Sequence, residues 1–196
     1  MAPVTDERGA ILTEPAPATP PRWLEPEERE AWLGFLRVLA KLPPLLDAQL
    51  ERSADLTLFE YTVLAMLSEQ PDRALRMTRL AVLTNASPSR LSHAARHLEA
   101  RGLVAREADP DDGRCIRAVL TEAGLALVEA AAPGHVAAVR ELFLDALGPG
   151  QLRGLREANE RILRRIDPGE ATRPPWLPGE TAVGAVDDDH RGGVLS

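Results

Sequence analysis

The amino-acid sequence predicts a mainly α-helical fold that carries one two-stranded β-hairpin. The first observation is the spacing of apolar residues, which recur at steps of three and four through most of residues 26–166, the period of an amphipathic helix. The second is a change of that period to two in the short runs 103–108 and 115–120, which is typical of strands. The charged segment between the runs, DPDDGR, supplies a turn, so we expect the two strands to pair as a hairpin.

Composition favours one domain between two flanking segments. The flanks, 1–22 and 167–196, are rich in proline and charge, so we expect a disordered arm, one domain at 23–166 and a disordered acidic tail. The single cysteine excludes an internal disulfide framework and is typical of a reducing compartment. No apolar run reaches the length of a membrane span, so the sequence predicts a cytoplasmic protein that does not contact a membrane.

The distribution of charge indicates a nucleic-acid partner. The whole chain carries a formal net charge of −7. Residues 76–117 instead contain eight arginines and five acidic residues, which gives a local net charge of +3 (8 − 5). A basic segment within an acidic chain is the pattern expected of a nucleic-acid-binding module.

The first two long helices are predicted from a stripe of apolar residues and from signals for helix starts and breaks. Residues 26–42 place apolar side chains on one stripe, and Pro43-Pro44 is expected to break or kink that helix because proline lacks an amide donor. Helix is expected to resume after the prolines. Thr57 and Glu60 then form a capping-box pattern, which predicts the start of the next helix.

Two shorter helices precede the hairpin. One is expected around 78–83, and the next begins at Ser87, an N-cap residue followed by proline at the first helical position. Gly102 is a matching stop signal for that helix. A short helix, a tight turn, a second helix and a β-ribbon follow one another in the order of a winged helix-turn-helix.

The segment after the hairpin returns to helix. Thr121 is expected to cap a long helical stretch that Pro133-Gly134 interrupts. A last amphipathic helix is expected at 152–166, where an apolar stripe has no neighbour to cover it within so small a lobe.

The helix that begins at Ser87 has two faces. One face is apolar and is expected in the core: Leu91, Ala94, Ala95 and Leu98. The other carries hydroxyl, guanidinium and imidazole groups: Ser89, Arg90, Ser92, His93 and Arg96. Such groups bond phosphates and base edges in a major groove, and the free amides at the helix start also favour a phosphate. A plain solvated helix face has a similar composition and is the alternative.

The motifs after this helix resemble those of one family. The run LEARGLV (98–104) is followed by D-x-R at Asp112-Gly113-Arg114 and by LT-x-x-G at residues 120–124. With the upstream run LTLFEYTVLAMLSE, these motifs make residues 56–166 similar to the MarR family of transcriptional regulators, which are dimeric winged-helix proteins.

The resemblance implies a fold, a partner and a set of site residues. It implies a homodimer with dimerisation helices at 26–53 and 121–166 and a DNA-binding lobe at 57–120, acting on a pseudo-palindromic double-stranded DNA operator, most simply as a repressor. The DNA contacts that we expect are Ser87, Ser89, Arg90, Ser92, His93, Arg96, Asp112 and Arg114. Among them, Arg114 would enter the minor groove from the wing tip, and Asp112 would orient its guanidinium group. The family also suggests a small aromatic or phenolic effector, for which Trp32, Arg37 and Tyr61 are the candidate residues.

A metal site and a redox sensor remain as alternative functions for a few residues. His93 and His97 have the i, i+4 spacing of many zinc sites, but Ala94 stands where a zinc hydrolase has glutamate, so surface placement is favoured over a metal site. Cys115 could sense peroxide, but it lies in the wing and has no partner cysteine, so a plain strand residue is favoured.

Enzyme chemistry is not indicated by any motif. The sequence contains no glycine-rich phosphate loop, no nucleophile elbow and no closed cysteine–histidine set, so we expect neither catalysis nor a cofactor. The competing function is a winged helix that binds another protein without specific DNA binding. A metal- or redox-sensing regulator is a further alternative.

Overall fold

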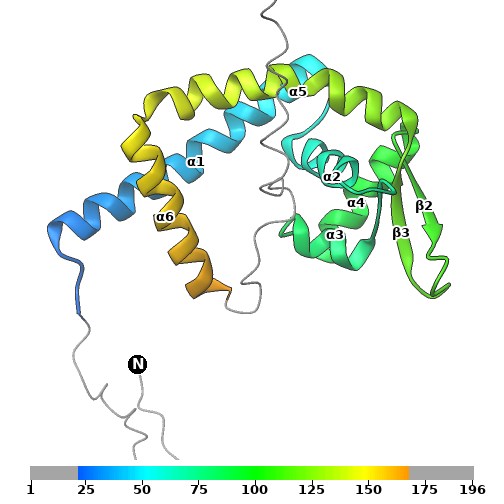
Figure 1. Cartoon of the computed structure of the whole chain (residues 1–196), viewed down its shortest axis with the longest axis horizontal. Coiled ribbons are helices and arrows are strands. Elements are labelled where there is room, and N and C mark those ends of the chain that lie inside the picture. The colour runs from blue at the N-terminus through cyan, green and yellow to red at the C-terminus, as the bar shows by residue number, and fades with distance from the viewer. Residues whose placement is uncertain (1–21, 168–196) are drawn as a thin grey trace, which may run out of the picture. The chain divides into compact units, whose positions relative to one another are not determined.

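The computed structural model describes residues 22–167, and Figure 1 shows their arrangement. The expectations for the N-terminal arm and the acidic tail concern residues 1–21 and 168–196, which lie outside this part of the chain. Within residues 22–167, no helix combines the length and the apolar character needed to cross a membrane.

The described chain is mainly helical and carries one small antiparallel sheet, which confirms the predicted fold class. In chain order the elements are α1 (Pro26–Ala54), α2 (Leu58–Ser68), β1 (Ala74–Arg76), α3 (Met77–Leu83), α4 (Pro88–Ala100), β2 (Val104–Ala108), β3 (Ile116–Leu120), α5 (Glu122–Leu142), the 3-10 turn η1 (Leu144–Ala146) and α6 (Pro149–Ile166). The chain forms two compact units, one ending at Ala40 and the other beginning at Lys41, so α1 contributes residues to both.

A break or a kink was expected at Pro43-Pro44, and the break is wrong, because α1 continues through both prolines. Each proline removes one amide donor, but its fixed φ is compatible with helix. The turn that follows is held by other contacts. Leu46 and Leu50 are buried, and the Asp47 carboxylate accepts a hydrogen bond of 2.6 Å from the amide that begins α2. These contacts offset the two missing hydrogen bonds.

The expected interruption at Pro133-Gly134 is also wrong, because α5 is one helix. Ala131 is buried before the proline, and after it the His135 ring packs against Tyr61 of α2 with the ring centroids 4.6 Å apart. Packing on both sides of the proline therefore keeps the helix continuous.

The sheet has three strands in the order β1-β3-β2, one more than the predicted hairpin. The hairpin itself is confirmed, with Val104 opposite Leu120 and Ala108 opposite Ile116. The additional strand, β1, pairs with the outer edge of β3, where Ala74 lies opposite Val119. A strand of three residues is too short to show a period of two, so the sequence pattern gave no sign of it.

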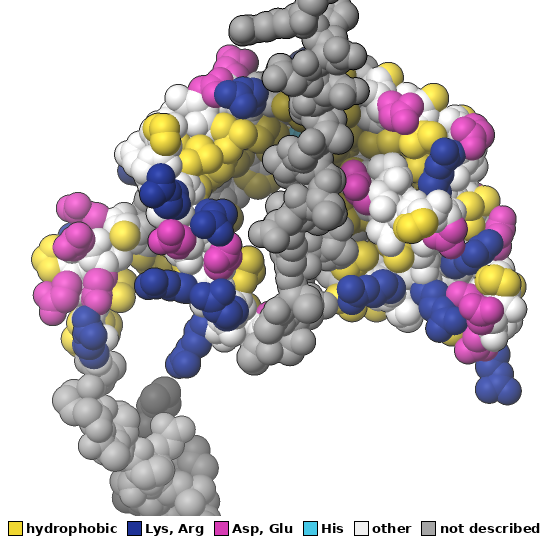
Figure 2. Space-filling model, viewed as in Figure 1, with side chains coloured by type: hydrophobic (Ala, Val, Ile, Leu, Met, Phe, Trp, Pro, Cys, Tyr) yellow, Lys and Arg dark blue, Asp and Glu magenta, His cyan; other side chains and the backbone are white. Residues whose placement is uncertain are grey.

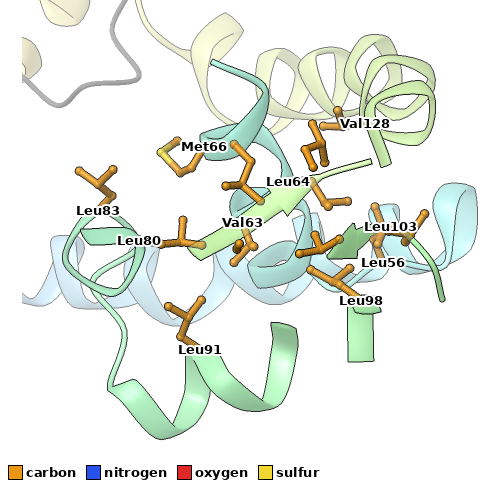
Figure 3. Packing of buried hydrophobic residues seen from close by; sticks show 14 residues of the cluster. Leu56, Val63, Leu64, Met66, Leu80, Leu83, Leu91, Leu98, Leu103 and Val128 are labelled. Carbon is orange, nitrogen blue, oxygen red and sulfur yellow. The ribbon is translucent and has the colours of Figure 1, made fainter. Parts of the chain in front are cut away.

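One hydrophobic cluster organises the lobe formed by α2, α3, α4 and the sheet. Figure 3 shows its side chains pointing inward from these elements and from α5. The four apolar residues predicted for the core face of α4 are all buried: Leu91, Ala94, Ala95 and Leu98. Leu91 and Leu98 pack with Val63 and Leu64 of α2, which fixes the face that α4 turns to solvent.

A short junction, formed by Gly102, Leu103, Thr121 and Gly124, connects the end of α4 and the start of β2 to the start of α5. Gly102 has φ of +71°, a left-handed conformation that ends α4. The Thr121 hydroxyl donates to the Gly102 carbonyl at 2.8 Å and caps α5 by accepting from the Gly124 amide at 3.0 Å. A Cβ atom on Gly124 would lie 2.1 Å from the Leu103 carbonyl oxygen, so only glycine fits there. We call these four residues the α4–α5 junction.

Candidate nucleic-acid interface

The start of α4 is formed as the sequence predicted. Ser87 is the N-cap, its hydroxyl oxygen accepts a hydrogen bond of 3.3 Å from the Arg90 amide, and Pro88 occupies the first turn. The Ser87 and Ser89 hydroxyls lie 3.1 Å apart and exposed. Pro88 has no amide hydrogen, and the Arg90 and Leu91 amides are bonded to Ser87. The Ser89 amide and one of the two hydroxyls therefore remain to donate to an anion, which is the chemistry that a DNA phosphate requires.

The outward face of α4 carries the polar residues that the sequence assigned to DNA. Arg90, His93 and Arg96 are exposed, and Ser92 is half-buried. Arg96 bends back along its own helix, where its Nε donates to the Ser92 carbonyl at 3.2 Å. The opposite face is in the core, so these side chains are available to a ligand without any change in the fold.

Arg90 is held by an aromatic ring. Its Cζ lies 4.1 Å from the centroid of the Phe59 ring, which belongs to α2. Phe59 is half-buried and packs against the hydrophobic cluster. Sequence analysis did not identify Phe59, because a contact between two helices leaves no mark in the spacing of either.

The wing consists of β2, β3 and the loop 109–115 between them. Where this loop begins, Asp109 is 7% exposed and receives the Arg76 guanidinium through Nε at 2.7 Å and Nη2 at 3.1 Å. The same carboxylate accepts hydrogen bonds from the amides of Asp111 and Asp112. The Arg76 hydrogen bond, with help from these amides, lowers the pKa of Asp109 to about 2. Asp109 therefore organises the loop as a carboxylate, a role that the sequence analysis missed.

The predicted role of Asp112 needs correction. Its Oδ1 accepts a hydrogen bond of 3.1 Å from the backbone amide of Arg114, not from the guanidinium group. Its Oδ2 accepts from the Cys115 thiol at 3.5 Å. A short side chain two residues before Arg114 reaches the nearby amide more readily than the end of a long arginine. Asp112 therefore shapes the turn, while Arg114 is exposed at the wing tip, where the sequence placed it.

Cys115 is in a poor environment for reactive sulfur. The hydrogen bond to Asp112, together with partial burial and the Asp112 charge, raises the pKa of its thiol. Thiolate is the reactive form, so this environment disfavours oxidation chemistry.

His97 lies beside α2 and contacts Glu60. Its Nδ1 is 2.5 Å from Glu60 Oε1, while Glu60 Oε2 accepts from the Thr57 amide at 3.0 Å and completes the predicted capping box. Burial by itself raises the pKa of Glu60, but the hydrogen bonds from Thr57 and His97 outweigh it, so the pKa lies below its usual value. Glu60 thus connects the start of α2 to α4 as a carboxylate.

A cavity of about 850 Å³ lies beside this contact. The second half of α1, the start of α2 and the outward edge of α4 line it, including Pro43, Phe59, Glu60, Arg90, His93 and His97. Its wall combines the Phe59 ring and apolar carbons with the Arg90 guanidinium and two imidazoles, and the Asp47 and Glu60 carboxylates also line it. A small planar molecule fits beside the ring, and a negative charge on it would have to lie on the Arg90 side.

The three residues predicted for an effector do not line this cavity. Trp32 packs against Phe35 with the ring centroids 6.2 Å apart and is half exposed, and Arg37 is exposed. Tyr61 is half-buried against His135, and burial raises its pKa. A role for these three residues stays a prediction.

Two further basic side chains of the lobe are paired with acids. Arg106 bonds Glu99 at 2.6 Å, and Arg117 bonds Glu107 at 3.3 Å. Figure 2 shows basic side chains along the edge of the lobe below α3 and α4 and at the end of the wing, with acidic ones among them. Within residues 22–167, His93 and His97 belong to no group of three or more side chains that could hold a metal ion.

Comparisons with known proteins agree with this geometry. A family model described as MarR family matches residues 54–114. Sco3205 of Streptomyces coelicolor, a MarR family transcriptional regulator solved in complex with DNA, is 41% identical with a TM-score of 0.74, over 81% of this chain and 99% of that one. AbsC of the same organism, also a MarR family regulator, is 39% identical with a TM-score of 0.72, over 76% and 99%.

A third solved structure has a ligand. CouR of Rhodococcus jostii RHA1, bound to p-coumaroyl-CoA, is 27% identical with a TM-score of 0.58, over 66% of this chain and 90% of that one. The comparison with curated proteins gave no match.

Proposed function

Since the chain belongs to the MarR family of transcriptional regulators, we propose that it binds a specific double-stranded DNA operator as a homodimer and regulates transcription there. In this proposal residues 23–166 form the working domain, with dimerisation helices at 26–53 and 121–166 and a DNA-binding lobe at 57–120. Repression follows most simply, because a dimer seated on an operator blocks access to it. The protein acts in the cytoplasm, where the DNA is, and catalyses no reaction.

The observation that carries this proposal is the division of α4 into two faces. Four apolar residues fix the helix in the core, and Ser87, Ser89, Arg90, Ser92, His93 and Arg96 occupy its start and its outward side. A helix held in this way presents base-reading and phosphate-binding groups together. Sco3205, the 41% identical relative, was solved in complex with DNA.

The wing supplies a second contact. Arg114 is exposed at the tip, on a loop that Asp109 and Asp112 hold through backbone amides. An arginine on a narrow ribbon fits a minor groove, which is most negative over A·T-rich steps. Recognition helix and wing together would read one half-site.

A second copy of the chain is the expected partner of α6. Its apolar side chains are exposed in the single chain, including Ile166 at 72% and Leu163 at 55%. A continuous apolar stripe of this kind marks an interaction surface. Two lobes related by a two-fold axis would place their recognition helices about 10 bp apart, one turn of DNA.

An effector is proposed for the cavity beside α4. CouR was solved with p-coumaroyl-CoA, an aromatic acyl thioester with anionic groups. The cavity in this chain joins Phe59 to Arg90, His93 and His97, and a small aromatic or phenolic anion matches that lining. Such a ligand would bias the two lobes between DNA-binding and released positions. The site predicted at Trp32, Arg37 and Tyr61 is the alternative location.

Selection of binding sites from a random duplex library tests the function. The full chain should enrich a pseudo-palindrome with half-sites about 10 bp apart, and affinity for it should fall steeply with salt. A winged helix used only for protein contact would enrich no sequence. A basic surface without specificity would bind all duplexes alike with the same salt dependence.

A further inference from the structure

The contact between Arg90 and Phe59 differs in kind from the contacts of Arg76, Arg106 and Arg117. Arg76, Arg106 and Arg117 bond acidic side chains. Arg90 makes no ion pair with any residue among 22–167, and its guanidinium lies over the Phe59 ring at 4.1 Å from the centroid.

The kind of partner decides whether the N–H donors of a guanidinium group remain free to bind DNA. An acid occupies the N–H groups of an arginine, and these bonds must break before the arginine can bind a base. A ring contacts only the flat face of the guanidinium and leaves the N–H donors at its edge available. Arg90 is therefore restrained and retains its hydrogen-bonding capacity.

The ring itself is fixed by the core. Phe59 is half-buried and packs against the hydrophobic cluster, and the Thr57–Glu60 capping box fixes the turn of α2 on which it stands. Arg90 lies in the first turn of α4, and its amide is bonded to the Ser87 cap. Both partners thus stand on well-defined backbone, so the contact sets the direction of a long side chain.

We propose that Phe59 is a positioning residue for DNA recognition, which holds the Arg90 guanidinium over its ring with the donor edge free for a base or phosphate. This inference rests on the proposed function. A free arginine loses rotamer freedom when it binds, and a stacked one has lost part of it beforehand. Phe59 would therefore raise affinity and sequence preference without contacting DNA itself.

A double-mutant cycle on the selected operator, with the full chain, tests this. An exposed cation–π contact is equivalent to about a two- to fivefold change in an equilibrium constant, so Phe59→Leu should weaken operator binding by about that factor. In an Arg90→Ala background the same substitution should have no effect. Phe59→Tyr, which keeps the ring, should bind as wild type does.

Arg96 provides the matched control. It lies on the same helix, but its guanidinium nitrogen is bonded to the Ser92 carbonyl and not to a ring. Phe59→Leu should therefore weaken binding by the same factor in an Arg96→Ala background as in wild type. Circular dichroism should show unchanged helix content in each variant, and Phe59→Met serves as a second ring-free variant if the leucine variant unfolds.

Nuclear magnetic resonance of the DNA-free protein gives a readout that does not depend on an operator. The Arg90 side-chain protons should be shifted upfield by the ring current in wild type and in Phe59→Tyr, and should return to ordinary values in Phe59→Leu.

Three results would overturn the inference: wild-type affinity in Phe59→Leu, higher affinity in that variant, or an equal loss with and without Arg90. Failure of the wild-type chain to enrich any sequence would instead overturn the proposed function, and it would be seen before any variant was compared.

Discussion

The Asp109 carboxylate binds the Arg76 guanidinium through two hydrogen bonds, at 2.7 and 3.1 Å, and so connects the start of the wing loop to the end of β1. Two residues 33 positions apart thereby fix where the wing loop leaves the sheet. Because the same carboxylate also accepts two loop amides, its loss should loosen the wing tip as well as the ion pair.

The first prediction concerns pH. The pKa of Asp109 is lowered to about 2, so its contribution to stability is complete above the unfolded-state pKa, near 3.9, and is lost as pH falls from about 4 towards 2. Asp109→Asn should melt at a lower temperature than wild type at neutral pH, and the difference should shrink across that window. A constant difference from neutral pH down to about 2 would contradict the assignment.

The second prediction concerns Gly124. Alanine there would place a Cβ 2.1 Å from the Leu103 carbonyl oxygen, so Gly124→Ala should lower the free energy of unfolding by about 1–3 kcal/mol, as overpacking does. Gly154→Ala in α6 is the matched control. Its Cβ meets nothing within 4 Å, and alanine should favour that helix by about 0.5–1 kcal/mol. Urea unfolding of both variants checks the contrast, and equal effects would rule out a tight α4–α5 junction.

The third prediction concerns Arg114. Its side chain is exposed at the wing tip, so Arg114→Ala should leave the melting temperature nearly unchanged. Operator binding should weaken, the salt slope should fall by about one unit per wing, and preference for A·T-rich flanks should be lost. Asp112→Ala removes the bond to the Arg114 amide and should cause a milder defect of the same kind. Wild-type binding by Arg114→Ala at physiological salt would refute the wing contact.

The fourth prediction concerns Cys115. The bond to Asp112 raises the pKa of the thiol, so little thiolate exists at neutral pH. Cys115→Ser should bind the operator as wild type does, and peroxide should affect both proteins equally in a gel-shift titration. Peroxide-induced release of DNA that the serine variant escapes would support a redox sensor instead.

The fifth prediction concerns assembly. Exposed apolar residues of α6, Ile162 at 48% among them, should be covered by a second copy. Sedimentation should show a dimer at micromolar concentration, and Ile162→Asp should shift it towards monomer or unfolded chain because burying a carboxylate in an apolar contact is costly. A folded wild-type monomer with full helix content would contradict the dimer.

Local signals in the sequence predicted the recognition helix well. Its cap at Ser87 and its stop at Gly102 depend on neighbouring residues, and its two faces follow from the helical period. Proline signals for a break were misleading at Pro43 and Pro133 because tertiary contacts kept each helix continuous. These contacts follow Pro43, and they lie on both sides of Pro133.

Contacts between distant residues could not be predicted in this way. β1 exists because it pairs with β3, far along the chain, and its three residues carry no pattern of their own. The pairs Arg76–Asp109 and Phe59–Arg90 likewise join different elements. The sequence shows which types of residue are present, but contacts between residues far apart in the chain depend on the tertiary fold.

The α4–α5 junction limits how the lobe can move. Two hydrogen bonds cross it, from the Thr121 hydroxyl to the Gly102 carbonyl and from the Thr121 amide to the Leu103 carbonyl. The Gly124 backbone lies so close to Leu103 that not even a Cβ atom would fit between them, so the two segments cannot slide past each other. A rotation of α5 would therefore move α4 and the wing with it, as one rigid body. If the proposed effector releases DNA by moving this lobe, the chain must bend elsewhere, for example at the η1 turn, Leu144–Ala146. Substitutions there would then change the response to the effector without altering either binding surface.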